Sequence, residues 1–161
     1  MVSLLRTACE ADDGRDPARD SASAGRHHAR RLLIQALYQW QISGDDPGDI
    51  LLQFVDGRDT SRADTDYFRE LMRAIPAEIE AIDADIAPLL ERQVAMVDPV
   101  ERAILRLACY ELRERREVPA RVVIDEAVEL AKAFGAEQGH RFVNGVVDRL
   151  AHRIRAREFG G

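Results

Sequence analysis

Cysteine and long apolar runs are scarce in this chain of 161 residues. The only cysteines are Cys9 and Cys109, and neither belongs to a C-x-x-C pair, which argues against a disulfide framework and against a cysteine zinc site. No apolar run approaches the roughly 18 residues of a membrane span. Residues 1–5 also lack the cationic and apolar regions of a signal peptide. We therefore expect a cytoplasmic protein without a membrane anchor.

The sequence motifs of common enzymes are also absent. There is no Gly-rich phosphate loop, no H-E-x-x-H and no G-x-S-x-G elbow. None of the four histidines has a second ligand at metal spacing; they are His27, His28, His140 and His152. We therefore expect no enzymatic activity, no cofactor and no metal.

Strand-like alternation of apolar and polar residues is missing, whereas helical spacing is frequent. Apolar residues recur every three to four positions from Phe68 to Leu89, with Pro76 inside the pattern. Between Ser61 and Glu91 this predicts one kinked helix or two collinear helices, opened by a capping box at Ser61-x-x-Asp64. The fold class is all-α, with about six or seven helices.

Start and stop signals place the remaining helices. The first is expected to begin near Gly25 and to end before residues 44–49, and a short helix follows over 49–55. Asp98-Pro99 begins another, and Arg113, Arg115 and Arg116 suit the dipole at its C-terminus. Two helices follow Pro119, the first stopped by Gly135 in a left-handed conformation.

The first 24 residues differ from the rest, because they are small, charged and aperiodic. We interpret residues 1–24 as a disordered extension and residues 25–157 as the folded domain.

Charge is segregated along the chain. The net charge of −6 combines −2 over residues 1–24, +3 over 25–43, −9 over 44–91 and +2 over 92–161. An acidic total therefore does not exclude nucleic acid, since binding depends on the local patch. Of the 23 basic residues 22 are arginine, whose planar guanidinium binds phosphate bidentately.

Two segments have the composition of a nucleic-acid site. The first is GRHHARR at 25–31, where cations crowd a helix N-terminus that disfavours them and a phosphate would relieve the repulsion. The second is Arg141-Phe142, a cation beside an aromatic ring, as single-stranded nucleic acid requires. Ordinary alternatives stay open: the basic cluster can be a solvated helix end, and Phe142 can be a core residue.

Four stretches resemble the NusB family of bacterial transcription antitermination factors. They are ARRLLIQALYQWQIS, DYFRELM, VERAILRLACYEL and VPARVVIDEAVELAKAFGAEQGHRFVNGVVDRL, which together extend over about 25–150. The resemblance implies an all-helical fold of two small subdomains without catalytic activity. It also implies binding of boxA RNA as a heterodimer with NusE, a protein of the small ribosomal subunit, in a complex that lets RNA polymerase read through terminators in ribosomal RNA operons.

The resemblance also implies site residues. The RNA contacts would be Arg26, His27, His28, Arg30, Arg31, Phe134, Arg141 and Phe142. Histidines stand at 27 and 28 where the family has arginines, and Phe134 fits the core as well as it fits a ligand. The NusE-facing residues would be Tyr38, Glu101 and Arg106. Gln138-Gly139 replaces an acidic and small pair that is common in the family.

Two other readings remain. The same fold occurs as an RNA-targeting module in front of an rRNA cytosine methyltransferase, although this chain has no catalytic motif beside it. The other reading is a helical bundle that only binds proteins, in which GRHHARR is simply solvated. RNA binding that weakens steeply with salt would distinguish a ribonucleoprotein from this bundle.

Overall fold

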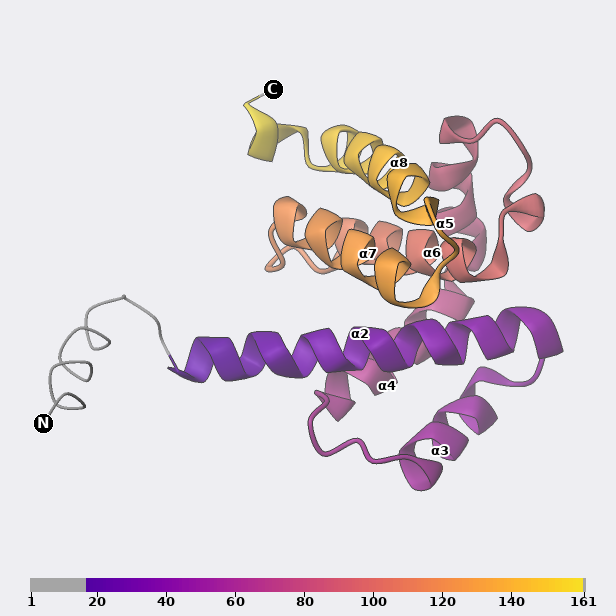
Figure 1. Cartoon of the computed structure of the whole chain (residues 1–161), viewed down its shortest axis with the longest axis vertical. Coiled ribbons are helices and arrows are strands. Elements are labelled where there is room, and N and C mark those ends of the chain that lie inside the picture. Colours follow the sequence, from indigo (N-terminus) through magenta and orange to yellow (C-terminus); the bar gives the residue numbers. More distant parts are fainter. Residues whose placement is uncertain (1–16, 161) are drawn as a thin grey trace, which may run out of the picture.

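The computed structural model describes residues 17–160, and this part of the chain contains seven α-helices and no strand (Figure 1). The expected all-α class is thereby confirmed. The helices are α2 (Pro17–Ser43), α3 (Pro47–Gly57), α4 (Thr65–Ala77), α5 (Ile79–Ile86), α6 (Pro99–Glu114), α7 (Ala120–Phe134) and α8 (Gly139–Ile154). Three 3₁₀ turns complete the chain: η1 (Ala87–Leu89), η2 (Val94–Met96) and η3 (Ala156–Phe159).

The longest helix, α2, crosses the middle of the molecule (Figure 1). It packs against α3 and α4 on one side and against α6 and α7 on the other, and α8 covers α6 and α7. Leu33, Phe68 and Leu150, from the three parts of this arrangement, are all fully buried in one continuous core. A single core therefore fixes the orientation of α2 relative to α7 and α8.

The helix α2 begins earlier than the sequence indicates. Its described part starts at Pro17 instead of near Gly25, so residues 17–24, which we assigned to a disordered extension, are helical. The side chains that follow, at 20–24, are exposed. Residues 17–24 therefore continue α2 without burying an apolar face. This explains why the sequence of this segment shows no helical periodicity. The expected disorder of residues 1–16 lies outside the described residues.

Three caps control where helices begin. Oδ1 of Asp98 accepts hydrogen bonds from the amides of Val100 and Glu101, as the Asp98-Pro99 signal predicts. Asp46 caps α3 in the same way, so α3 begins at Pro47, ahead of the expected 49. The predicted capping box at Ser61 is wrong, because Asp64 is itself the cap of α4, accepting from the amide of Tyr67 at 3.0 Å.

The apolar pattern around Pro76 forms two helices. Proline lacks the N–H that would bond to the carbonyl of Met72, and α4 ends at Ala77, one residue after it. Glu78 separates α4 from α5 with a non-helical backbone. Phe68, Met72, Ile75, Ile82 and Ile86 are nevertheless all buried. The apolar stripe therefore describes the buried face correctly on both sides of the break.

The turn between α7 and α8 differs from expectation at Gly135. Its φ is −86°, so it is not left-handed. Glycine fits here because a Cβ would stand 2.7 Å from the carbonyl oxygen of Ala131. The left-handed residue is Gln138, with a φ of 72°. A non-glycine residue in this conformation strains the backbone directly before α8.

The C-terminus of α6 is capped by a residue from the end of the chain. The buried guanidinium of Arg155 donates to the carbonyls of Glu111, Leu112, Arg115 and Val118 at 2.7–3.1 Å. The carbonyls belong to the last turn of α6 and to the segment that follows it, and those of Glu111 and Arg115 accept a backbone amide as well. Arg155 therefore adds a cation from the C-terminal part of the chain to the end of α6, where Arg113 already lies in the last turn as expected.

Candidate nucleic-acid interface

The basic residues of α2 divide between two faces of the helix. Residues four apart share a face, so Arg26 and Arg30 point one way and His27 and Arg31 point another. The first pair meets α4 and α6, and the second meets α7, although Nη1 of Arg30 also lies 3.7 Å from Oε1 of Glu126 on α7. GRHHARR is therefore not one surface but two.

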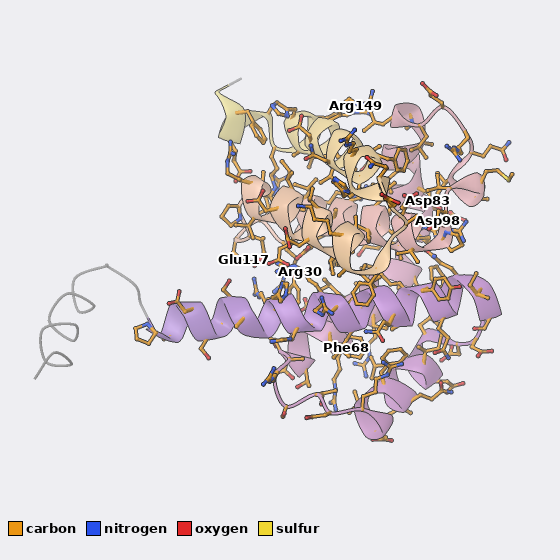
Figure 2. All side chains as sticks on the ribbon, in the orientation of Figure 1. Arg30, Phe68, Asp83, Asp98, Glu117 and Arg149 are labelled. Carbon is orange, nitrogen blue, oxygen red and sulfur yellow. The ribbon has the colours of Figure 1, made fainter. Side chains whose placement is uncertain are left out.

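The first face is a buried charge network. Arg30 is 2% exposed and Glu111 is 1% exposed. Nε of Arg30 donates to Oε1 and Oε2 of Glu111 at 3.1 and 3.0 Å, and Nη2 lies 2.9 Å from Oε2 in an ion pair. The Tyr67 hydroxyl donates to the same carboxylate. This network joins α2, α4 and α6 inside the molecule (Figure 2 labels Arg30, between α2 and the helices above it).

Electrostatics keeps this network in one protonation state. Burial lowers the pKa of Arg30, but the charge and hydrogen bonds of Glu111 outweigh burial and raise it. Burial, followed by the charge of Glu111, raises the pKa of the Tyr67 phenol. Arginine therefore stays charged and tyrosine stays protonated, so that both donate to Glu111. The predicted RNA contact at Arg30 is corrected here: its guanidinium is buried and binds Glu111.

Arg26 lies at the solvent edge of the same network. Its guanidinium carbon is 4.5 Å from the centre of the Tyr67 ring, and that of Arg115 is 5.0 Å away. Arg115 also pairs with Glu70 at 2.9 Å. Arg26, half-buried, has no carboxylate partner within the described residues. It therefore keeps hydrogen-bond donors for an external anion.

The second face brings α2 and α7 together. The Arg31 guanidinium carbon lies 4.9 Å from the centre of the Phe134 ring, and Nδ1 of His27 is 2.8 Å from Oε2 of Glu126. The His28 ring lies edge to face with the His27 ring, with centroids 5.7 Å apart. Phe134 is half-buried, with part of the ring packed on the core. A cation from α2 and an aromatic from α7 thus form one half-buried platform.

Arg141 and Phe142 lie in a separate groove. It runs between α8 and residues 89–92, with a volume of about 560 Å³. Arg141 is exposed, and within the described residues its side chain makes no hydrogen bond or ion pair. Phe142 is half-buried against the core. Among residues 17–160, no hydrogen bond, ion pair or ring contact joins these two side chains to the basic cluster of α2, so the predicted site consists of two halves.

The three residues expected to face a protein partner have different environments. Tyr38 is 41% exposed and lines an apolar groove of about 470 Å³ on α2, whose walls include Ile42, Phe54, Val100 and Phe134. Tyr38 and Phe134 therefore border the same space, so a partner seated there would lie next to the platform of Arg31 and Phe134.

Glu101 and Arg106 are engaged within the molecule. Glu101 lies against Gly139, where a Cβ would collide with its Oε1. Burial, then Asp98, raises the pKa of Glu101, while Arg92 acts in the opposite direction. Arg106 donates to both oxygens of Asp83 and to Gln41 at 2.8–3.0 Å. Its position favours joining α2, α5 and α6 more than binding a partner.

Sequence reasoning missed Glu111 and Tyr67. Glu111 occupies a position four residues after Leu107, on the stripe that α6 buries, where a carboxylate is unusual. A charged residue on an apolar stripe was the available signal for a buried ion pair. The partner of Glu111, Arg30, gives the same signal on α2, because it is a charged residue next to the buried Ala29.

Comparison with known proteins agrees with this arrangement. The model of the NusB family matches residues 27–152, which include the basic residues of α2 from His27 to Arg31, all of α7 and most of α8. The chain belongs to the NusB family. This confirms the resemblance on which the site residues were assigned.

NusB proteins of known sequence match nearly end to end. The transcription antitermination protein NusB of Idiomarina loihiensis is 49% identical over 132 residues, which cover 82% of this chain and 95% of the relative. That of Yersinia pestis (strain Pestoides F) is 47% identical over 135 residues, covering 84% and 98%.

Solved NusB structures have the same fold. T. maritima NusB superimposes with a TM-score of 0.73 at 31% identity, covering 84% of this chain and 97% of that one. A chain from a crystal structure of the antitermination factors NusB and NusE in complex with dsRNA superimposes with a TM-score of 0.66 at 30% identity, covering 78% and 94%.

The structure accounts for one residue of the Gln138-Gly139 pair. Gly139 is buried and leaves room for the Glu101 carboxylate, which a side chain would displace. Gln138 adopts the left-handed conformation, which Asp and Asn tolerate better than Gln does. Gly139 therefore has a steric reason, whereas nothing in the structure explains Gln138.

Two further observations concern membrane-spanning helices and the thiol of Cys109. No helix among residues 17–160 is long and apolar enough to cross a membrane. Cys109 is fully buried, and burial followed by the charge of Asp85 raises the pKa of its thiol to about 12. This thiol is therefore protonated at neutral pH and is no nucleophile.

Proposed function

We propose that this protein is a transcription antitermination factor that binds boxA-type single-stranded RNA together with NusE. Membership of the NusB family supports this proposal, since relatives at 45–49% identity are named as antitermination proteins. The supporting feature of the chain itself is the platform of Arg31 and Phe134, 4.9 Å apart and contributed by two helices distant in sequence. The protein acts by binding and not by catalysis, in the cytoplasm where transcription takes place.

The platform has the chemistry of a site for single-stranded RNA. A guanidinium and an aromatic face offer stacking surfaces to bases, each stacked base contributing about 1–3 kcal/mol, and the guanidinium adds a phosphate contact. Arg26 supplies a second cation without a carboxylate partner among the described residues. The rings of His27 and His28 lie edge to face, with centroids 5.7 Å apart. RNA is proposed to contact the face of α2 that carries His27 and Arg31, with Arg26 on the neighbouring face.

The groove around Tyr38 is the proposed surface for NusE. It is mainly apolar, and Tyr38 and Ile42 expose 41% and 59% of their surface in it. Tyrosine in such a groove contributes a large contact area at small entropic cost. Because Phe134 also lines this groove, protein and RNA would meet at one residue. Binding of either is then expected to favour binding of the other.

The test is a titration of fluorescently labelled boxA-type RNA with the protein, with and without NusE. We expect tighter binding in the presence of NusE and a log–log salt slope of about −0.7 for each phosphate contacted. Duplex RNA of the same sequence serves as the comparison strand. A salt-independent signal, or equal affinity for a strand of scrambled sequence, would favour a protein-interaction module or an RNA-targeting module without an antitermination role.

A further inference from the structure

One wall of the groove around Tyr38 carries a cation, Arg58. Within residues 17–160 it is the one charged residue among those that line this groove, whose other walls bear apolar, amide and hydroxyl side chains. Arg58 directly follows α3, at the C-cap of the helix, and it is exposed. The residues expected to face NusE do not include it. The proposed surface for NusE therefore contains a positive charge that has no assigned role.

The guanidinium of Arg58 is held in place from two sides. Its central carbon lies 4.3 Å from the centre of the Phe54 ring, and Nη1 donates to Oε1 of Gln35 at 2.6 Å. Gln35 is itself fixed, because its Nε2 donates to the carbonyl oxygen of Arg31, one turn earlier on α2, at 3.2 Å. A long side chain normally loses much rotamer freedom when it binds a partner. Arg58 is already ordered, so that little of this entropy remains to be lost.

Arg58 has no carboxylate partner among the described residues, although it lies in the most acidic part of the chain, residues 44–91. The neighbouring Asp59 accepts instead from the amide of Ser61 at 3.0 Å. A guanidinium has five N–H donors, and those on Nε and Nη2 of Arg58 make no hydrogen bond in the part of the chain described. The charge also suits the C-terminal dipole of α3, an effect that uses none of these donors. They remain available to an external anion.

The surroundings of Arg58 favour a carboxylate of a protein over a phosphate of RNA. A groove that follows a single strand needs a row of cations along the backbone, whereas this groove has one. Tyr38 and Ile42 expose 41% and 59% of their surface, which suits apolar side chains. A guanidinium binds a carboxylate through two parallel hydrogen bonds. Apolar walls beside one ordered guanidinium therefore fit a protein segment that carries an apolar and an acidic side chain.

We propose that Arg58 selects the segment of NusE that enters this groove, by pairing with an Asp or Glu of NusE next to an apolar side chain seated over Tyr38 and Ile42. The inference depends on the proposed binding of NusE and deepens it, because it specifies the chemistry of the partner segment. Phe54 and Gln35 hold the guanidinium ready for the pair. The bound partner excludes water from the pair and thereby strengthens it.

The first test removes the charge or only its planar shape. Arg58→Gln should weaken binding of purified NusE about tenfold or more, as for a charge pair that loses one partner. Arg58→Lys keeps the charge without the fork of donors and should lose less. Binding of boxA-type RNA in the absence of NusE should stay unchanged for both variants. Arg62→Gln, at an exposed arginine that does not line the groove, is the matched control, and denaturant unfolding shows whether each variant is folded.

The second test reverses the charge and identifies the partner residue. Arg58→Glu places like charges opposite each other and should weaken NusE binding more than Arg58→Gln does. Each Asp and Glu of NusE is then changed to Arg in turn and titrated against Arg58→Glu. We expect one of these NusE variants to restore about tenfold of the lost affinity, and a double-mutant cycle with that residue isolates the energy of the pair.

The outcomes separate this inference from the proposed function. If wild-type protein binds NusE while Arg58→Gln and Arg58→Glu bind it equally well, the inference is overturned and the proposed function survives. If no NusE variant restores binding to Arg58→Glu, the guanidinium does not pair with a carboxylate of NusE and the inference is overturned as well. If Arg58→Gln weakens binding of RNA alone, Arg58 is an RNA contact instead. If wild-type protein fails to bind NusE, the proposed function fails together with the inference.

Discussion

Arg30 and Arg31 are adjacent in the sequence and have opposite surroundings. Arg30 is buried and bonded to both oxygens of Glu111, whereas the Arg31 guanidinium lies over the half-buried Phe134 ring. One step along a helix rotates a side chain by 100°, which is enough to move it from the core to the surface. The difference shows that a basic motif can combine structural and ligand-binding arginines, and that counting its cations overestimates the RNA surface.

The largest expected effect follows from breaking the buried network. Arg30→Ala leaves the Glu111 carboxylate buried without its cation and should lower the free energy of unfolding by about 3–5 kcal/mol. Urea denaturation followed by circular dichroism measures it. The triple change Arg30→Met, Glu111→Leu, Tyr67→Phe removes every polar member together and should restore most of this loss. A small effect of Arg30→Ala would mean that Glu111 is hydrated and the network is not buried in solution.

A smaller effect, on binding, is expected at Phe142. Phe142→Ala should weaken boxA-type RNA binding by about 1–3 kcal/mol, the contribution of one stacked base. Since the ring also packs on the core, some stability is lost as well. Phe142→Leu separates the two roles, because leucine keeps apolar packing but offers no aromatic face. Fluorescence titration of Phe142→Leu should therefore show weakened RNA binding with a near-normal unfolding midpoint; normal RNA binding would make Phe142 a core residue only.

The smallest effect is expected at Arg31. Arg31→Ala removes a half-buried cation–π contact of about 0.5–1 kcal/mol, so the stability of the variant should stay close to that of the wild type. Its RNA affinity should fall, with a salt slope shallower by about 0.7. Arg31→Lys keeps the charge but not the planar group, and is expected to restore the slope without restoring the full affinity. Loss of stability equal to that of Arg30→Ala would abolish the distinction between the two faces.

The order of helices was predictable from local signals. Asp98-Pro99 carries its own start signal, and the apolar stripe from Phe68 to Ile86 identifies the buried faces of α4 and α5. Such signals act over a few residues, so the sequence contains them completely. The prediction for Gly135 failed at short range, since its reason is the carbonyl oxygen of Ala131 and not a left-handed backbone. The role of Arg155 at the end of α6 was missed because its partners lie about 40 residues away in the chain.

Only part of the candidate site could be predicted from the sequence. The residue types of GRHHARR and Arg141-Phe142, together with the family resemblance, are properties of the sequence. The sequence does not show which of these residues share a surface. The contact of Arg31 with Phe134 and the groove lined by Phe142 and Arg92 depend on how the helices pack. No local pattern indicates that the platform and the groove are separate.

The sequence by itself determined the all-α class, the buried faces of the helices and the membership of the NusB family, because helical periodicity, caps and family motifs are local. Only the tertiary structure decided that Arg30 is a core residue, that Arg31 forms a platform with Phe134, and that Arg155 caps α6. The physical reason is that the free energy of a charged side chain depends on burial and on partners far away in the chain, which no local pattern contains.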